Sequence, residues 1–183
     1  SLGAGVQSSC LALMAQEGLT KHKPDYMIFA DTGWEPSFVY EHVEYLKKAI
    51  TICPIITVER GNLREDLIRA ANPIKGSNEE HKSFAGRVPN PPLFAARPGG
   101  KVGMLYRQCT HDYKVIPIQK KMREILGIKP RHRVKKDMLV EQWIGISTDE
   151  AMRMKKARMY WLTSRWPLIE MKMSRADCLQ WYR

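Results

Sequence analysis

The sequence lacks any apolar run of the roughly 20 residues that a membrane-spanning helix requires. It also contains only four cysteines, at positions 10, 53, 109 and 178, and no two of them have Cys-x-x-Cys spacing. Such sparse cysteines favour a reducing, cytoplasmic setting over a disulfide scaffold. The hydrophobic content of 44% and the charged content of 27% are typical of a globular protein. We therefore expect one domain over residues 1–183 and no membrane partner.

Acidic residues are scarce in the second part of the chain. Residues 1–100 carry 11 Lys+Arg and 11 Asp+Glu, whereas residues 101–183 carry 19 Lys+Arg and 8 Asp+Glu, so the whole net charge of +11 lies in that part. Such a charge attracts phosphorylated small molecules or nucleic acid. The run 129–136 has five Lys/Arg in eight positions. It is either a solvated connection or a contact for a nucleic-acid backbone.

Apolar periodicity predicts strands and helices that alternate along the chain. The expected strands are 26–30, 55–58 and 140–146; the expected helices are 8–17, a helix from Pro36 to Ile50, a helix capped by Asn62, 114–126 and a last helix capped by Ser174. Residues 73–103 are rich in Pro and Gly and are expected to form a long loop or lid. The alternation predicts a parallel sheet with helices on both faces, which binds its ligand beyond the carboxyl ends of the strands.

The first nine residues, Ser1-Leu2-Gly3-Ala4-Gly5-Val6-Gln7-Ser8-Ser9, form a glycine- and serine-rich turn at the start of a helix. Such a turn exposes backbone N–H groups at the positive end of the helix dipole, which suits phosphate. The alternative is a plain connection. Because the turn starts at residue 1, we expect the strand before it and a C-terminal tail to be missing.

Four blocks together resemble the adenine nucleotide alpha hydrolase-like, or PP-loop, superfamily, and within it the phosphoadenosine phosphosulfate reductase-like family. They are residues 1–9, Asp31-Thr32-Gly33-Trp34-Glu35, the segment 107–118 and the segment 143–153. Divergent members of this kind occur in phage and mobile elements. The resemblance implies a mostly parallel, five-stranded, Rossmann-like sheet with helices on both faces.

The resemblance also implies the site residues. It assigns nucleotide binding to Ser1, Gly3, Gly5, Gln7, Ser8, Ser9, Asp31, Thr32, Gly33 and Gly145, and anion binding to Arg107, Lys114 and Arg153. The alternative for Asp31 is a turn in which it caps the following helix. The chain departs from the family pattern at Gly3, where the family usually has serine, at Ala4, where it has glycine, and at three further places. Gln7 stands where ATP-cleaving members have aspartate, Ser147 or Thr148 replaces an arginine, and one residue is inserted before Lys114.

Cys109 is the candidate catalytic residue. In the adenylyl-sulfate branch of the family a cysteine pair at this place joins a later Cys-x-x-Cys to hold a [4Fe–4S] cluster. This chain has one cysteine here, so a cluster needs cysteines from outside residues 1–183. The alternative is that Cys109 is a small buried hydrophobic residue.

These observations predict an adenine-nucleotide-dependent enzyme. It resembles phosphoadenosine phosphosulfate reductase or a PP-loop ATP pyrophosphatase, with ATP or an adenylyl sulfate-type nucleotide as ligand, Mg²⁺ as a candidate metal, and sulfur transfer or nucleic-acid modification as its task. The alternative is a non-catalytic module that binds nucleotide or nucleic acid on the same fold.

Overall fold

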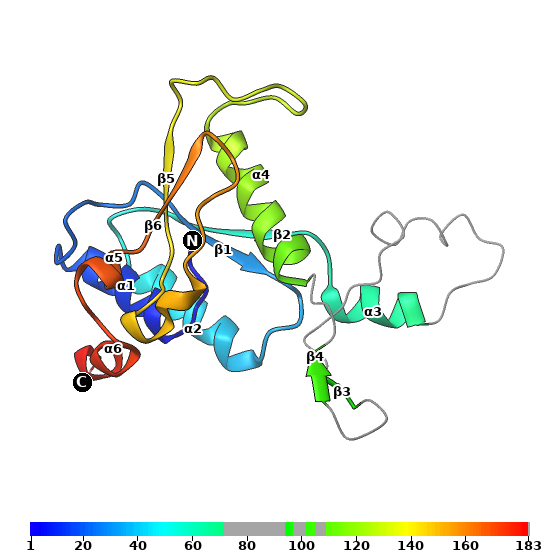
Figure 1. Ribbon diagram of the computed structural model, residues 1–183, viewed down its shortest axis with the longest axis horizontal. Coiled ribbons are helices and arrows are strands. Elements are labelled where there is room, and N and C mark those ends of the chain that lie inside the picture. The colour runs from blue at the N-terminus through cyan, green and yellow to red at the C-terminus, as the bar shows by residue number, and fades with distance from the viewer. Residues whose placement is uncertain (72–93, 97–101, 105–108, 183) are drawn as a thin grey trace. The chain divides into compact units, whose positions relative to one another are not determined.

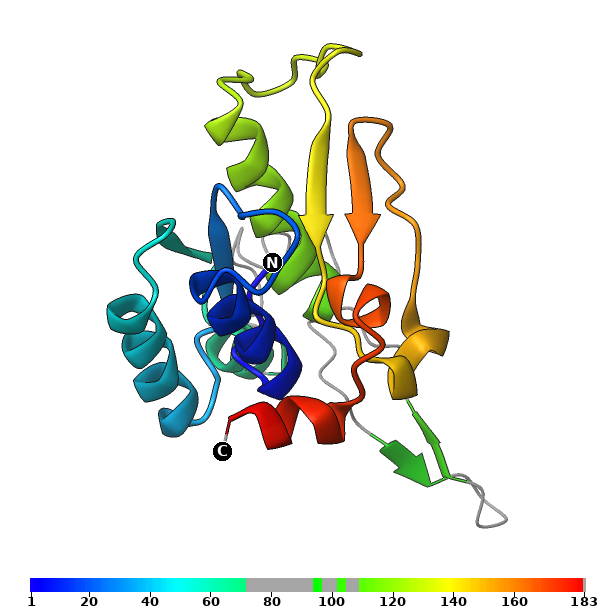
Figure 2. The ribbon, with the colours of Figure 1, turned by 90° about the vertical axis from the view of Figure 1, so that its left-hand side faces the viewer.

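The computed structural model describes residues 1–71, 94–96, 102–104 and 109–182. The chain divides into two compact units. Unit 1 comprises residues 1–29, 36–57 and 121–183, and unit 2 comprises residues 30–35 and 58–120. Figures 1 and 2 show the elements from two directions. Each unit is described by itself below.

Unit 1 contains most of the helices. It holds α1 (Val6–Gln16), α2 (Ser37–Ala49), η3 (Thr148–Arg153), α5 (Pro167–Glu170) and α6 (Arg175–Trp181), with the strands β5 (Val140–Trp143) and β6 (Leu162–Arg165). The first parts of β1 (Met27–Asp31) and β2 (Ile55–Glu59) and the end of α4 (Ile116–Ile125) also belong to it. The predicted helices at 8–17, 36–50 and from Ser174 are confirmed as α1, α2 and α6.

Two apolar clusters form the core of unit 1. One joins Leu2 and α1 to β1 and α2, with Phe29 and Leu46 among its buried members. The other joins α1 to α5 and α6 through Cys10, Leu168 and Cys178, all of which have no exposed surface. Helix α1 is buried on both sides, and this explains why seven of its eleven residues are buried.

The prediction of a five-stranded sheet is wrong for the described residues. They form a parallel pair β1–β2, a parallel pair β5–β6 and an antiparallel pair β3–β4. Ser1 and Leu2 connect the two parallel pairs, because Ser1 bonds to β5 and Leu2 bonds to β1. The Ser1 nitrogen donates to the Trp143 carbonyl at 2.7 Å, and Leu2 forms one isolated bridge with Phe29. Two residues are too few for a ladder, so the two parallel pairs remain separate.

Unit 2 contains α3 (Leu63–Ala71), β3 (Phe94–Ala96), β4 (Val102–Met104), the π-helical turn η2 (Thr110–Val115) and the first part of α4. Asn62 caps α3 as predicted, because its Oδ1 accepts the backbone N–H groups of Arg64 and Glu65 at 3.0 and 3.1 Å. Most of the predicted loop or lid at 73–103 lies outside the described residues. Its described parts, β3 and β4, form an antiparallel pair that the sequence did not predict.

Sequence reasoning also missed β6 and η3. Strand β6 reads Leu-Thr-Ser-Arg and has a single buried residue, so it carries no apolar run. Its position is set by pairing with β5, from Val140 opposite Leu162 to Trp143 opposite Arg165. No helix among the described residues has the length and apolar character needed to cross a bilayer.

The core predicts a contrast between two positions on α2. Leu46 is fully buried, whereas Phe38 is 67% exposed. We expect Leu46→Ala to lower the free energy of unfolding by about 2–5 kcal/mol, because it opens a cavity. Phe38→Ala, which removes a larger side chain, is the control and is expected to change it by less than about 0.5 kcal/mol. Urea unfolding measures both; equal losses would contradict the described core.

Candidate nucleotide-binding site

The glycine-rich loop is held in shape by its own side chains. The Ser8 hydroxyl accepts the backbone N–H groups of Gly3 and Gly5, at 3.3 and 3.2 Å, and donates to the Gly5 carbonyl. Ala4 has φ of 53°, a left-handed conformation that costs a residue with a Cβ about 1–2 kcal/mol. The first N–H groups of α1, beginning at Val6, have no partner within the helix. The N–H groups of Gly3 and Gly5 are therefore bound to Ser8, and the backbone donors of this segment without a helical partner are those of the first turn of α1.

Gly145 lies directly against this loop. A Cβ on Gly145 would stand 2.8 Å from Cα and 2.9 Å from N of Ser8, both backbone atoms. The segment after β5 therefore contacts the first turn of α1 at a distance that only glycine allows. This contact brings together the first and the fourth of the blocks on which the resemblance rests, within unit 1.

Gln7 points inward and is 8% exposed. Its amide nitrogen donates to Oε2 of Glu150 at 3.2 Å and to the buried Ser147 hydroxyl at 3.4 Å. Its amide oxygen accepts from Arg175 at 3.1 Å. A carboxylate at this position would face the Glu150 carboxylate without a proton between them. The network thus requires an amide, and it engages both polar ends of Gln7.

Ser9 is also turned away from the loop. It is fully buried, and its hydroxyl lies 2.9 Å from Nε2 of His42 on α2. The Tyr182 hydroxyl donates to the Val6 carbonyl at 3.1 Å. The side chains of Gln7, Ser8 and Ser9, all predicted to bind nucleotide, therefore hold the start of α1 in place. The backbone of the loop is left as the group that faces a ligand.

Unit 2 brings together the second and third blocks. Asp31 accepts the Gly33 N–H at 2.7 Å within the turn, whereas the N-cap of the following helix α2 is Pro36. Gly33 has φ of 68° and lies against Asn62. Lys114 reaches the same turn, where its Nζ donates to Oε1 of Glu35 at 2.9 Å, and Thr32 donates to that same oxygen at 3.1 Å. Lys114 is thus near Thr32 and is paired with a carboxylate.

The inserted residue before Lys114 coincides with the π-helical turn η2. A π-helical turn takes up one extra residue within a helix, and such turns are frequent at functional sites. Tyr113 within it is fully buried and donates to Asp66 at 2.6 Å. Burial and this hydrogen bond raise the pKa of Tyr113 above its usual value. The turn is therefore anchored to α3 inside unit 2.

Three predicted site residues remain, namely the anion ligands Arg107 and Arg153 and the candidate catalytic residue Cys109. Arg153 forms an ion pair with Glu150 at 2.7 Å, and its side chain is 62% exposed. Arg107 lies outside the described residues. Cys109 precedes η2 and is partly exposed. Among the described residues, no group of three His, Cys, Asp or Glu side chains is placed to hold a metal ion. We therefore derive no reaction step through Mg²⁺ or an iron–sulfur cluster.

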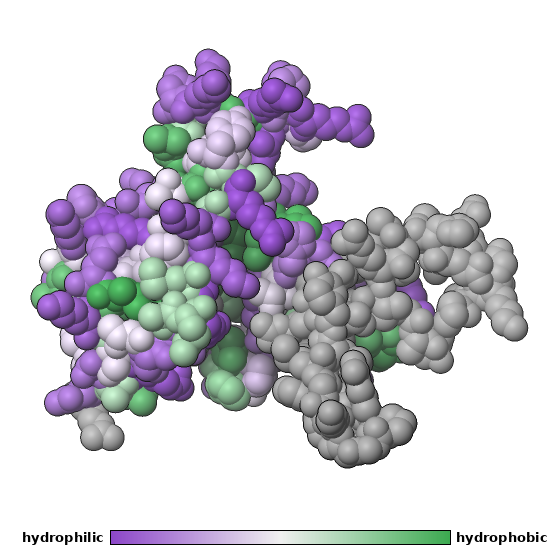
Figure 3. Space-filling model, viewed as in Figure 1, coloured by the Kyte–Doolittle hydropathy of each residue, from purple (hydrophilic) through white to green (hydrophobic). Residues whose placement is uncertain are grey.

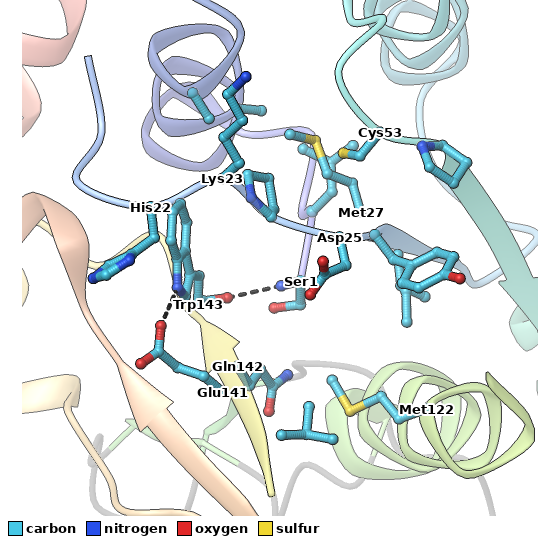
Figure 4. Close-up of a pocket in the computed structure, with 18 of the residues that line it drawn as sticks. Ser1, His22, Lys23, Asp25, Met27, Cys53, Met122, Glu141, Gln142 and Trp143 are labelled. Carbon is cyan, nitrogen blue, oxygen red and sulfur yellow. Dashed lines mark hydrogen bonds between the residues drawn. The ribbon is translucent and has the colours of Figure 1, made fainter. Parts of the chain in front are cut away.

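A cavity of about 800 Å³ lies beside the loop in unit 1. Figure 4 shows that side chains from the start of β1, from β5 and from α4 line it, with Met27, Met122 and Trp143 among those labelled. Its α1 lining comes from Ser8, Leu11, Ala12 and Ala15 rather than from the glycines. The lining also includes the polar residues Ser1, His22, Lys23, Asp25, Glu141 and Gln142, and neither Gly3 nor Gly5 belongs to it.

Comparisons of the chain with family models, curated proteins and solved structures found no match. The site therefore rests on its own geometry. Sequence reasoning missed Glu150, Arg175 and His42, which hold Gln7 and Ser9. The capping pattern Ser174-x-x-Asp177 located the start of α6, but nothing in the sequence indicated that Arg175 meets Gln7, 168 positions away.

The close approach at Gly145 predicts a difference between two glycines. We expect Gly145→Ala to lower the free energy of unfolding by about 1–3 kcal/mol, because the added methyl group overlaps the Ser8 backbone. In Gly3→Ala the new Cβ meets only the Ser8 hydroxyl at 3.5 Å, an ordinary contact, so little change is expected. Thermal unfolding compares the two variants. Equal stability of both would contradict the described contact.

The cysteines predict a selective labelling pattern. Burial raises the pKa of Cys10 to about 12, and burial also raises the pKa of Cys53 and Cys178. All three are buried, whereas Cys109 is partly exposed. Because the thiolate is the reactive form, an aromatic disulfide reagent at pH 8 is expected to label Cys109 first. The Cys109→Ser variant should lose the fast phase; its persistence would contradict the placement of Cys109.

Proposed function

We propose that this protein is an adenine-nucleotide-dependent enzyme that holds the phosphate or sulfate of ATP or an adenylyl sulfate on the glycine-rich loop. The observation that supports this most is the contact of Gly145 with Ser8, which joins two of the blocks that resemble the PP-loop family. The first-turn N–H groups at the positive end of an eleven-residue helix suit an anion.

The surroundings of Gln7 favour one branch of this chemistry. ATP-cleaving members of the family have an aspartate here, and the Glu150 carboxylate next to Gln7 disfavours a second acid. The chain therefore fits the variant of the loop that resembles the sulfonucleotide reductases better than the ATP pyrophosphatase variant. In that reaction a cysteine thiolate attacks the sulfate sulfur and an adenosine phosphate leaves. The resemblance makes Cys109, the partly exposed cysteine, the candidate catalytic residue; it belongs to unit 2, and the loop belongs to unit 1.

The loop backbone supplies the electrostatic part of this proposal. The N–H groups of the first turn of α1, which Ser8 and Gly145 hold in place, need no reorganisation when negative charge develops on a phosphate or sulfate oxygen. Asp31, Thr32, Gly33 and Lys114 are assigned to the nucleotide by the resemblance alone. Arg153 would need to leave Glu150 to contact an anion.

A thermal-shift measurement with ATP, AMP and adenosine 5′-phosphosulfate tests the proposal, with GTP as the control for the base. At a hundredfold excess over Kd, binding contributes about 2.7 kcal/mol, so the Tm is expected to rise by about 5–10 °C. The Gly3→Ala variant should keep the Tm of the free protein and show a smaller shift, because its methyl group obstructs the approach of an anion to the backbone. If no adenine nucleotide shifts the Tm, the proposal is wrong.

A further inference from the structure

Two basic loops of unit 1 precede neighbouring strands. The first, residues 127–139, joins α4 to β5, and the second, residues 154–161, joins η3 to β6. Their basic residues are Lys129, Arg131, Arg133, Lys135 and Lys136 in the first loop, and Lys155, Lys156 and Arg158 in the second. All eight side chains belong to exposed residues. Residues 140–153 separate the two loops in the sequence, and only the first was predicted as a nucleic-acid contact.

The tertiary structure brings the two loops side by side. Because β5 and β6 are parallel and Val140 pairs with Leu162, their amino ends start together. The Tyr160 hydroxyl donates to the Val134 carbonyl, and the Val140 N–H donates to the Trp161 carbonyl at 2.8 Å. Val134 and Trp161 are each 3% exposed and anchor the loops. Figures 1 and 2 both show the two loops at the same end of these strands.

The eight basic side chains of the two loops are not neutralised by ion pairs among the described residues. None of them belongs to the ion pairs that the described residues form, in contrast to Lys47, Lys114 and Arg165. Asp137 is the one acidic residue in the two loops. Figure 3 shows hydrophilic side chains over the end of the molecule where these loops lie. The surface thus presents a concentrated positive charge to solvent.

The exposed aromatic side chain of Tyr160 belongs to the second of these basic loops. Tyr160 is 59% exposed although its hydroxyl is fixed on the Val134 carbonyl, and Met159 beside it is 41% exposed. A ring held at its polar end and open on its faces is a stacking platform for an unpaired base. Cations flanking such a platform follow a phosphate backbone. The combination suits a single strand better than a duplex, whose bases are stacked on one another.

The geometry points to a binding surface for single-stranded nucleic acid, formed jointly by the loops 127–139 and 154–161. This basic-loop surface lies at the amino ends of β5 and β6, whereas Gly145 and the glycine-rich loop lie beyond the carboxyl end of β5. The inference is therefore independent of the proposed nucleotide site. Either can be correct when the other is wrong.

Fluorescence anisotropy with a labelled 20-nucleotide single strand tests the surface at several salt concentrations. Lys135→Ala/Lys136→Ala removes two charges from the first loop, and Lys155→Ala/Lys156→Ala removes two from the second. If one strand contacts both loops, each double variant lowers the slope of log K against log salt by about 1.4, at about 0.7 per lost phosphate contact. Lys47→Ala/Lys48→Ala on α2 removes the same charge elsewhere and should leave the slope unchanged.

Variants of Tyr160 separate stacking from charge. Tyr160→Phe keeps the ring and is expected to retain the affinity for the single strand within about twofold. Tyr160→Ala removes the platform and is expected to weaken it by at least about fivefold, with a smaller loss for a duplex of the same length. Circular dichroism confirms that each variant is folded before it is compared.

Three results would overturn the inference. The first is that both loop variants bind the single strand with the same affinity as the α2 control variant. The second is a loss in only one of the two loop variants, because the surface requires both loops. The third is binding to phosphatidylserine vesicles with the same dependence on the loop lysines while the oligonucleotide does not bind, which would assign the surface to a membrane instead.

Discussion

The arrangement of unit 1 depends on the contact between Gly145 and Ser8. Strand β5 ends at Trp143, and two residues later the chain meets the backbone of the first turn of α1. A side chain at Gly145 would hold these two backbones apart. Because they touch, Ser147 and Glu150 come within reach of Gln7, and the glycine-rich loop gains a fixed wall on one side.

The polar residues at the start of α1 serve mainly to hold it. Gln7 forms hydrogen bonds with Glu150 and Arg175, and Ser9 forms one with His42. Side chains fixed in this way hold the first turn of α1 in one conformation, and we propose that its N–H groups are preorganised for a phosphate or sulfate oxygen. In unit 2, Lys114 and Glu35 neutralise each other, so an anion that binds there must compete with a carboxylate.

Local signals in the sequence predicted helices and turns well. Asn62 and Ser174 mark the starts of α3 and α6 because their side chains accept N–H groups two or three residues ahead, a contact that needs no distant partner. Strands were predicted less well. Strand β6 has one buried residue and is a strand only because β5 lies beside it. The five-stranded sheet was inferred from alternation of elements, but pairing requires ladder length, and Leu2 supplies a single bridge.

The sequence by itself determined the caps, the amphipathic helices, the glycine-rich loop and the excess of positive charge, because each depends on residues close together in the chain. Only the tertiary structure decided which side chains face inward and which distant segments meet. Gln7 bonds to Arg175, and Tyr160 bonds to Val134, because distant elements pack together. Contacts between residues so far apart in the chain produce no periodic pattern in the sequence. That packing places the Gln7 and Ser9 side chains in hydrogen bonds within the protein and brings the two basic loops together.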